Sequence, residues 1–174
     1  MRLTLALMIL PGLALADDYG TNNPEELTMN RVLEDIAEGR TSMTNCAAGY
    51  LMTKSGRHGA ARQTFETCAN GGYTGAMTWM SYLDTNGFGG DYDPDAAADW
   101  DRRAAEAGDS VGQFNYGLSL LRGTGTARDE AAGRALIDRA AATGLPIAQR
   151  LQAAGYDPEE VTPDADAWRH APMN

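Results

Sequence analysis

The sequence is poor in the residues that build metal sites and nucleophilic catalytic centres. It contains two histidines, His58 and His170, which are too far apart in the chain to suggest one metal site. It has no G-x-S-x-G motif and no S-x-x-K motif, so the common patterns of serine-based catalysis are missing. We therefore expect no enzymatic activity, no metal and no cofactor.

Basic residues are scarce relative to acidic ones. The chain has 14 Lys and Arg residues against 24 Asp and Glu residues, which gives a formal net charge of −10. Such a charge repels the phosphate backbone of nucleic acids and the headgroups of anionic lipids. The composition therefore argues against nucleic-acid binding and against peripheral binding to a membrane surface.

Long apolar runs are absent beyond the first residues of the chain. Residues 1–16 combine a basic start, a short apolar run and the sequence Ala14-Leu15-Ala16, which is typical of a secretory signal peptide. No later segment is long and apolar enough to cross a bilayer. We expect cleavage after Ala16 and a periplasmic or secreted protein without an integral membrane segment.

Cysteine is limited to Cys46 and Cys68. In an oxidising compartment such a pair is expected to form a disulfide. The midpoint between them falls in Ser55-Gly56-Arg57-His58, which has the composition of a turn, so the two cysteines would face each other across an antiparallel hairpin. The alternative, a redox-active thiol pair, lacks the C-x-x-C spacing.

One stretch of the chain recurs at an offset of 36 residues. RRAAEAG at residues 102–108 is repeated as DRAAATG at residues 138–144, and Asp93 aligns with Asp129 at the same offset. Within each unit the apolar residues follow steps of three and four, and no useful length of chain alternates with the period of a strand. A repeat of this length predicts a stacked array of helix-turn-helix units, and hence an all-α fold.

Glycine and aspartate mark the ends of these predicted helices. Gly108 and Gly144 follow the last apolar residue of a helix, where a left-handed cap is favoured. Asp93 and Asp129 stand where an N-cap carboxylate would accept hydrogen bonds from free backbone amides. A further helix is predicted from about Pro24 to Glu38.

The repeated residues resemble the Sel-one-like repeat, a family related to the tetratricopeptide repeats. The matching positions of the best unit are Gly112, Tyr116-Gly117, Leu120, Gly123, Gly125, Asp129, Ala132 or Gly133, Leu136, Arg139-Ala140-Ala141 and Gly144. The unit before it keeps most of these positions, whereas Leu120 and Arg139 replace a tyrosine and a lysine of the family pattern.

This resemblance implies an all-α superhelix, or solenoid, of about three helix-turn-helix repeats with an N-terminal capping helix. We expect a signal peptide at residues 1–16, an N-terminal segment with the capping helix at 17–39, the repeat domain at 40–155 and an acidic, mobile tail at 156–174. In the family, the first helices of successive units line the concave face.

Four residues on these first helices are the predicted partner-binding residues. They are Trp79, Tyr82, Asn115 and Gln149. Trp79 also fits the apolar stripe of its helix, so it could instead pack wholly between units. Tyr82 lies off that stripe and is expected at the surface.

The function we predict is an extracytoplasmic interaction module that binds a peptide or a protein on its concave face. The alternative is a cell-envelope enzyme or enzyme-modulating factor, related to β-lactams or the cell wall. Its support is the sequence Lys54-Ser55-Gly56, which resembles one small motif of penicillin-recognising enzymes. A structural spacer is a third hypothesis.

Overall fold

The computed structural model describes residues 28–161, and within this range it contains eight α-helices, one 3₁₀ turn and no strand. The helices are α1 (Met29–Ala37), α2 (Met43–Lys54), α3 (His58–Asn70), α4 (Thr74–Asn86), α5 (Pro94–Glu106), α6 (Ser110–Arg122), α7 (Glu130–Ala142) and α8 (Pro146–Ala153), followed by the turn η1 (Pro158–Val161). The all-α prediction is confirmed. The predicted signal peptide and the chain beyond residue 161 lie outside the described residues.

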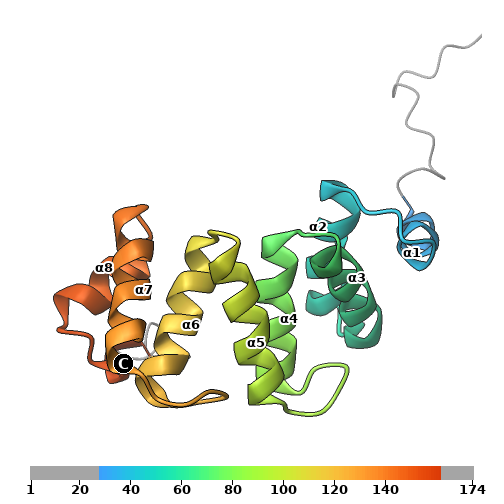
Figure 1. Ribbon diagram of the computed structural model, residues 1–174. Coiled ribbons are helices and arrows are strands. Elements are labelled where there is room, and N and C mark those ends of the chain that lie inside the picture. The colour runs from blue at the N-terminus through green and yellow to red at the C-terminus, as the bar shows by residue number, and fades with distance from the viewer. Residues whose placement is uncertain (1–27, 162–174) are drawn as a thin grey trace, which may run out of the picture.

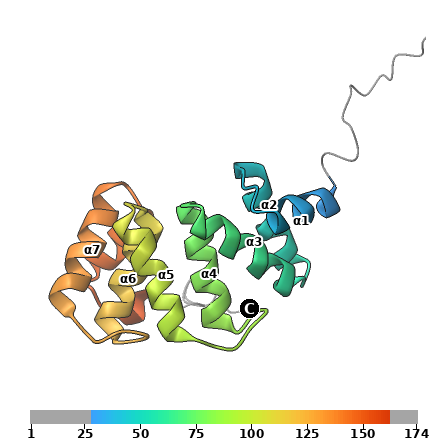
Figure 2. The same cartoon turned by 45° about the vertical axis from the view of Figure 1, so that its right-hand side comes forward.

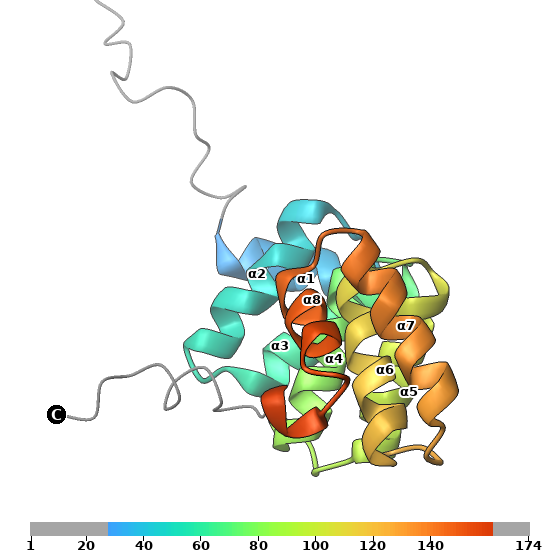
Figure 3. The same cartoon turned by 90° about the vertical axis from the view of Figure 1, so that its left-hand side faces the viewer.

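The helices form antiparallel pairs that stack in one direction (Figures 1 and 2). The pairs are α2 with α3, α4 with α5, and α6 with α7, and each helix contacts the next along the chain. Helix α1 packs on α2 and α3 and covers the first pair. Helix α8 and η1 close the other end, which faces the viewer in Figure 3. The predicted array of about three units with a capping helix is therefore present.

The predicted helix caps are confirmed. The carboxylates of Asp93 and Asp129 accept hydrogen bonds from the backbone amides of Ala96 and Ala132, each at 3.0 Å. Gly108 has a φ of 89°, a left-handed conformation that favours glycine. Helix α1 begins later than predicted, because the Thr28 side chain caps it by accepting from the Arg31 amide, 3.3 Å away.

Small residues allow the paired helices to approach closely. Gly117 of α6 lies against Gly133 of α7, and a Cβ atom added to Gly133 would lie 2.8 Å from the Gly117 carbonyl oxygen. Ala104 and Ala140, from the repeated alanine pairs, are fully buried. These alanines therefore serve helix packing, as their recurrence at the repeat offset suggests.

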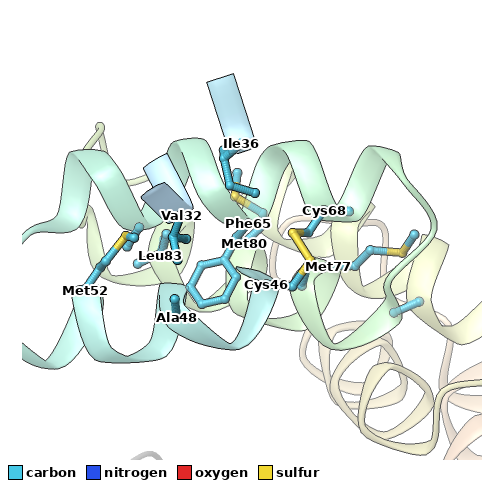
Figure 4. Close-up of a cluster of buried hydrophobic side chains, with 14 residues drawn as sticks. Val32, Ile36, Cys46, Ala48, Met52, Phe65, Cys68, Met77, Met80 and Leu83 are labelled. Carbon is cyan, nitrogen blue, oxygen red and sulfur yellow. A yellow bond between two sulfur atoms is a disulfide. The ribbon is translucent and has the colours of Figure 1, made fainter. Parts of the chain in front are cut away.

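The predicted disulfide joins Cys46 of α2 to Cys68 of α3, with their Cα atoms 5.9 Å apart. It lies in the core of the first units, beside Phe65 (Figure 4). The midpoint of the two cysteines falls in the α2–α3 turn, so the hairpin interpretation is correct. A bridge that closes a loop of this length stabilises the folded state by about 3 kcal/mol.

The end of the described chain packs against the last unit. Residues Pro158–Val161 form the short helical turn η1, and Val161 is buried in the C-terminal core cluster. The Arg122 guanidinium of α6 donates to the carbonyl oxygens of Pro158 and Val161, at 2.7 and 3.0 Å. Residues 156–161 therefore belong to the packed end of the array. None of the helices within residues 28–161 combines the length and apolarity that a membrane span needs.

Candidate partner-binding surface

The exposed side chains of the first helices of successive units, α2, α4, α6 and α8, are the candidate surface, which we call the first-helix face. Helices α4 and α6 contact each other directly, and more extensively than α3 contacts α5 or α5 contacts α7. Side chains of α2 and α4 also meet, because Tyr50 of α2 contacts Trp79 of α4 with ring centroids 5.4 Å apart. The family resemblance predicts that these first helices line the concave face, and this stays a prediction.

Two of the four predicted partner-binding residues lie together on α4. Trp79 and Tyr82 contact each other edge to face, with ring centroids 5.3 Å apart. Tyr82 is 43% exposed, as expected for a residue off the apolar stripe. Trp79 is half-buried: it stacks on the buried ring of Phe65 and presents its remaining surface to Tyr50. Trp79 therefore serves both the core and the surface.

The other two predicted residues lie apart from this pair. Asn115 of α6 is half-buried, and its side-chain amide donates to Asp101 at 3.1 Å. Gln149 of α8 is exposed, and its amide donates to the carbonyl oxygen of Ala141 at 3.2 Å. Both amides are thus already engaged within the protein, so the structure concentrates the surface on the first units.

Aromatic side chains extend the Trp79–Tyr82 pair in both directions. Tyr50 of α2 meets Trp79 at 5.4 Å, and Tyr82 meets Phe88 at 5.9 Å. We call Tyr50, Trp79, Tyr82 and Phe88 the aromatic row. His58 stacks on the Phe88 ring at 4.4 Å and ends the row. Such rings supply large apolar contact area at a low cost in side-chain entropy.

Two apolar pockets flank Tyr50 along the sides of α2. The α2–α4 pocket has a volume of about 270 Å³ and is lined by the following residues: Met43, Cys46, Ala47, Tyr50, Phe65, Tyr73, Thr74, Gly75, Ala76 and Trp79. The α1–α2 pocket has a volume of about 420 Å³ and is lined by the following residues: Met29, Val32, Thr44, Asn45, Ala47, Ala48, Tyr50 and Leu51. Tyr50 and Ala47 line both, so α2 forms a ridge between two pockets.

The sequence did not reveal the ridge, because apolar spacing alone does not show which apolar residues of α2 are buried. The structure leaves Met43, Tyr50 and Leu51 exposed by 76, 44 and 57%. The buried face of α2 is instead formed by Cys46, Ala48, Gly49, Met52 and Thr53. One feature of the sequence could have indicated the ridge: α2 has no polar face. Its apolar residues lie all round the helix, and there are more of them than one buried face can hold.

Acidic side chains are nearly absent from the first helices. Helices α2, α4, α6 and α8 contain one acidic residue, Asp84, against seven on α3, α5 and α7. Asp84 is only 3% exposed and forms an ion pair with Arg62 of α3, with an N–O distance of 2.6 Å. In a chain with a net charge of −10, the first-helix face therefore exposes almost no negative charge.

A second buried carboxyl group, Asp101 of α5, joins two units. Its carboxylate accepts hydrogen bonds from the Ser81 hydroxyl of α4 at 2.6 Å and from Asn115 of α6 at 3.1 Å. Burial raises the pKa of the Asp101 carboxyl to about 7, while the hydrogen bonds from Ser81 and Asn115 oppose the rise. With 4% of its surface exposed, Asp101 organises packing between units.

The sequence Lys54-Ser55-Gly56 lies at the end of α2 and has an ordinary structural explanation. Ser55 caps the helix, and its hydroxyl donates to the Met52 carbonyl oxygen at 3.0 Å. Among residues 28–161, the side-chain group bonded to this hydroxyl is the Arg57 guanidinium, at 3.4 Å, which is a donor and could not act as a base. Within residues 28–161 there is no cluster of three His, Cys, Asp or Glu side chains that could hold a metal ion.

Comparison with known proteins identifies the fold. No protein-family model and no curated protein matches the sequence. Among solved structures, a Sel1 repeat protein from Oxalobacter formigenes matches with a TM-score of 0.56 and 24% identity, over 62% of this chain and 45% of its own length. A protective antigen present in uropathogenic Escherichia coli strains, which displays an SLR fold, matches with a TM-score of 0.51 and 21% identity, over 69% of this chain and 31% of its own.

The chain therefore has the helical repeat fold that Sel1 repeat proteins display. This confirms the resemblance seen in the residues of the 36-residue unit. The chain spans less than half the length of either protein. At these identities the likeness defines the fold, and the partner has to be argued from the residues of this chain.

Proposed function

We propose that this protein is an extracytoplasmic interaction module that binds a protein or peptide partner on the first-helix face. The observation that carries the proposal is the aromatic row between the two apolar pockets of α2. Exposed, clustered apolar surface of this kind marks interaction sites in soluble proteins. Large aromatic residues are also the side chains that contribute most to binding at interfaces.

The proposed location outside the cytoplasm has two supports. The first is the signal-like sequence of residues 1–16. The second is the Cys46–Cys68 disulfide, since disulfides persist mainly in oxidising compartments. Periplasmic and fully secreted locations are equally compatible with both.

A binding role is favoured over the alternative of an envelope enzyme by the chemistry around the first-helix face. The pockets are lined by apolar, hydroxyl and amide side chains, and no Asp, Glu, His, Lys or Arg is among their lining residues. The surroundings of Ser55 likewise support no activated nucleophile. The geometry is suited to holding a partner.

The proposal can be tested by capture of partners from an envelope extract on immobilised residues 17–174. We expect a specific partner to be recovered by the wild type and lost with Tyr82→Ala, because truncation removes the exposed ring of the aromatic row. Tyr92→Ala is the matched control, since Tyr92 is an exposed tyrosine that lies outside the row.

Both variants must first show the melting temperature of the wild type. Equal recovery by wild type and Tyr82→Ala would place the binding site elsewhere. Loss with both variants would indicate a general loss of exposed aromatic surface, and would also contradict the proposal.

A further inference from the structure

We propose that the ridge formed by α2 selects an apolar peptide segment whose flanking residues are acidic and not basic. This inference rests on the proposed function and specifies the chemistry of the partner. It follows from the two pockets beside Tyr50 and from the charges that surround them.

The pockets define the apolar part of the ligand. They lie on opposite sides of α2 and share Tyr50 and Ala47 as a common wall. An extended segment that crosses α2 could place one large apolar side chain in each pocket. Met43 and Leu51, which are well exposed on the same helix, would be covered by such a segment.

The charges around the two pockets disfavour a basic ligand. No carboxylate lines either pocket, and the one acidic residue of the first helices, Asp84, is buried with Arg62. A lysine or arginine brought into contact with this surface would lose water without gaining a counter-ion. Among residues 28–161, the other acidic residues lie on α1, the second helices, η1 and the loops. The carboxylate nearest to the α1–α2 pocket is Asp35 of α1, which accepts a hydrogen bond from Asn45. Asp35 already forms ion pairs with Arg31 and Arg40.

Lys54 provides the favourable charge for an acidic flank. It is the only lysine in the sequence and an exposed residue at the end of α2. Its ammonium nitrogen lies 5.5 Å from the centre of the Tyr50 ring. The next charged residue along the chain, Arg57, is also basic and exposed. A carboxylate that follows an apolar anchor would therefore meet positive charge beside Tyr50.

The net charge of −10 does not remove this preference under physiological conditions. Charges separated by more than about 8 Å are largely screened at 0.15 M ionic strength. Long-range repulsion then affects mainly the rate of encounter, whereas contact with Lys54 is retained in the bound state.

The experiment is a selection of random displayed peptides on residues 17–174 at physiological ionic strength. We expect the selected peptides to be enriched in pairs of large apolar residues with flanking Asp or Glu, and depleted of Lys and Arg. Synthetic copies are then titrated against wild type, Tyr50→Ala, Lys54→Glu and Arg128→Glu. Arg128 is the matched control because it is an exposed cation on the α6–α7 loop.

The expected result is loss of binding with Tyr50→Ala, a weakening of about three- to tenfold with Lys54→Glu, and no change with Arg128→Glu. Because Lys54 is the only lysine, its acylation by an amine-reactive reagent provides a second readout by mass spectrometry. A bound acidic peptide should slow acylation of Lys54 in the wild type.

The outcomes separate the inference from the proposed function. Selected peptides rich in Lys or Arg, or binding that depends on Tyr50 but not on Lys54, would overturn the inference and leave the interaction module intact. No peptide dependent on Tyr50 or Tyr82 would contradict both. Self-association that Tyr50→Ala abolishes would show a second copy of the chain as the occupant, and would also overturn the inference.

Discussion

At the scale of single residues, Asp101 links three helices through one carboxyl group. It belongs to α5 and binds Ser81 of α4 and Asn115 of α6. Because burial raises its pKa to about 7, the folded protein retains a proton that the unfolded chain, with an ordinary pKa of 3.8, has already released at moderately acidic pH. Proton binding by the folded state stabilises it.

This linkage predicts that the free energy of unfolding falls as pH rises. The contribution of Asp101 is fully present below its unfolded pKa and is lost as pH rises through about 7. In Asp101→Asn the neutral side chain can still accept from Asn115 and donate to Ser81, so the decline should be smaller. Urea unfolding across this pH range measures the difference between the two proteins, which is expected to be on the order of a few kcal/mol.

Comparison with the variant isolates the contribution of Asp101, because every other titratable group is present in both proteins. Parallel curves for the wild type and Asp101→Asn would show that Asp101 is ionised throughout the range. They would contradict the raised pKa.

At the scale of elements, the close packing of α6 on α7 depends on two glycines, Gly117 and Gly133, which have no side chain at the contact. The Gly117 and Gly133 backbones face each other so closely that a Cβ atom on either would lie under 3 Å from the carbonyl oxygen of the other. We expect Gly133→Leu to lower the free energy of unfolding by about 3 kcal/mol, because the two helices would have to separate. Chemical denaturation gives the value directly.

The matched control for this substitution is Ala131→Leu, which adds bulk at an exposed position of the same helix. It should leave the stability nearly unchanged. An equal effect of both substitutions would contradict the proposed dependence on the close approach of Gly117 and Gly133, since helix propensity favours leucine over glycine.

At the scale of the whole molecule, the array is stabilised by different means along its length. The first units have the disulfide and the Arg62–Asp84 ion pair, whereas the last unit has a separate apolar cluster with Val161. In a linear array each unit contacts only its neighbours, so a local loss of stability need not spread to the far end.

Replacing both cysteines by alanine should therefore act locally. We expect faster hydrogen exchange in α2 and α3, and nearly unchanged protection in α6 and α7. Hydrogen-exchange mass spectrometry of wild type and the double variant resolves the two regions. Uniform acceleration over all helices would show that the chain unfolds as one cooperative unit.

Much of this fold could be predicted from the sequence, because its determinants are local or periodic. The offset of 36 residues, the glycines after each helix and the capping aspartates define the helix-turn-helix unit. The pairing of Cys46 with Cys68 follows from their distances to the Ser55-Gly56 turn. Position in the repeat also placed Trp79 and Tyr82 on the first-helix face.

The ridge on α2 and the internal charge network were decided by tertiary structure alone. Apolar periodicity identifies a helix but does not show which neighbour covers each of its faces, so the exposure of Met43, Tyr50 and Leu51 could not be predicted. The Arg62–Asp84 ion pair joins residues 22 positions apart, and Asp101 occupies a position that is apolar in the neighbouring units, Phe65 and Ile137. These contacts depend on how the helices stack, which no local pattern in the chain specifies.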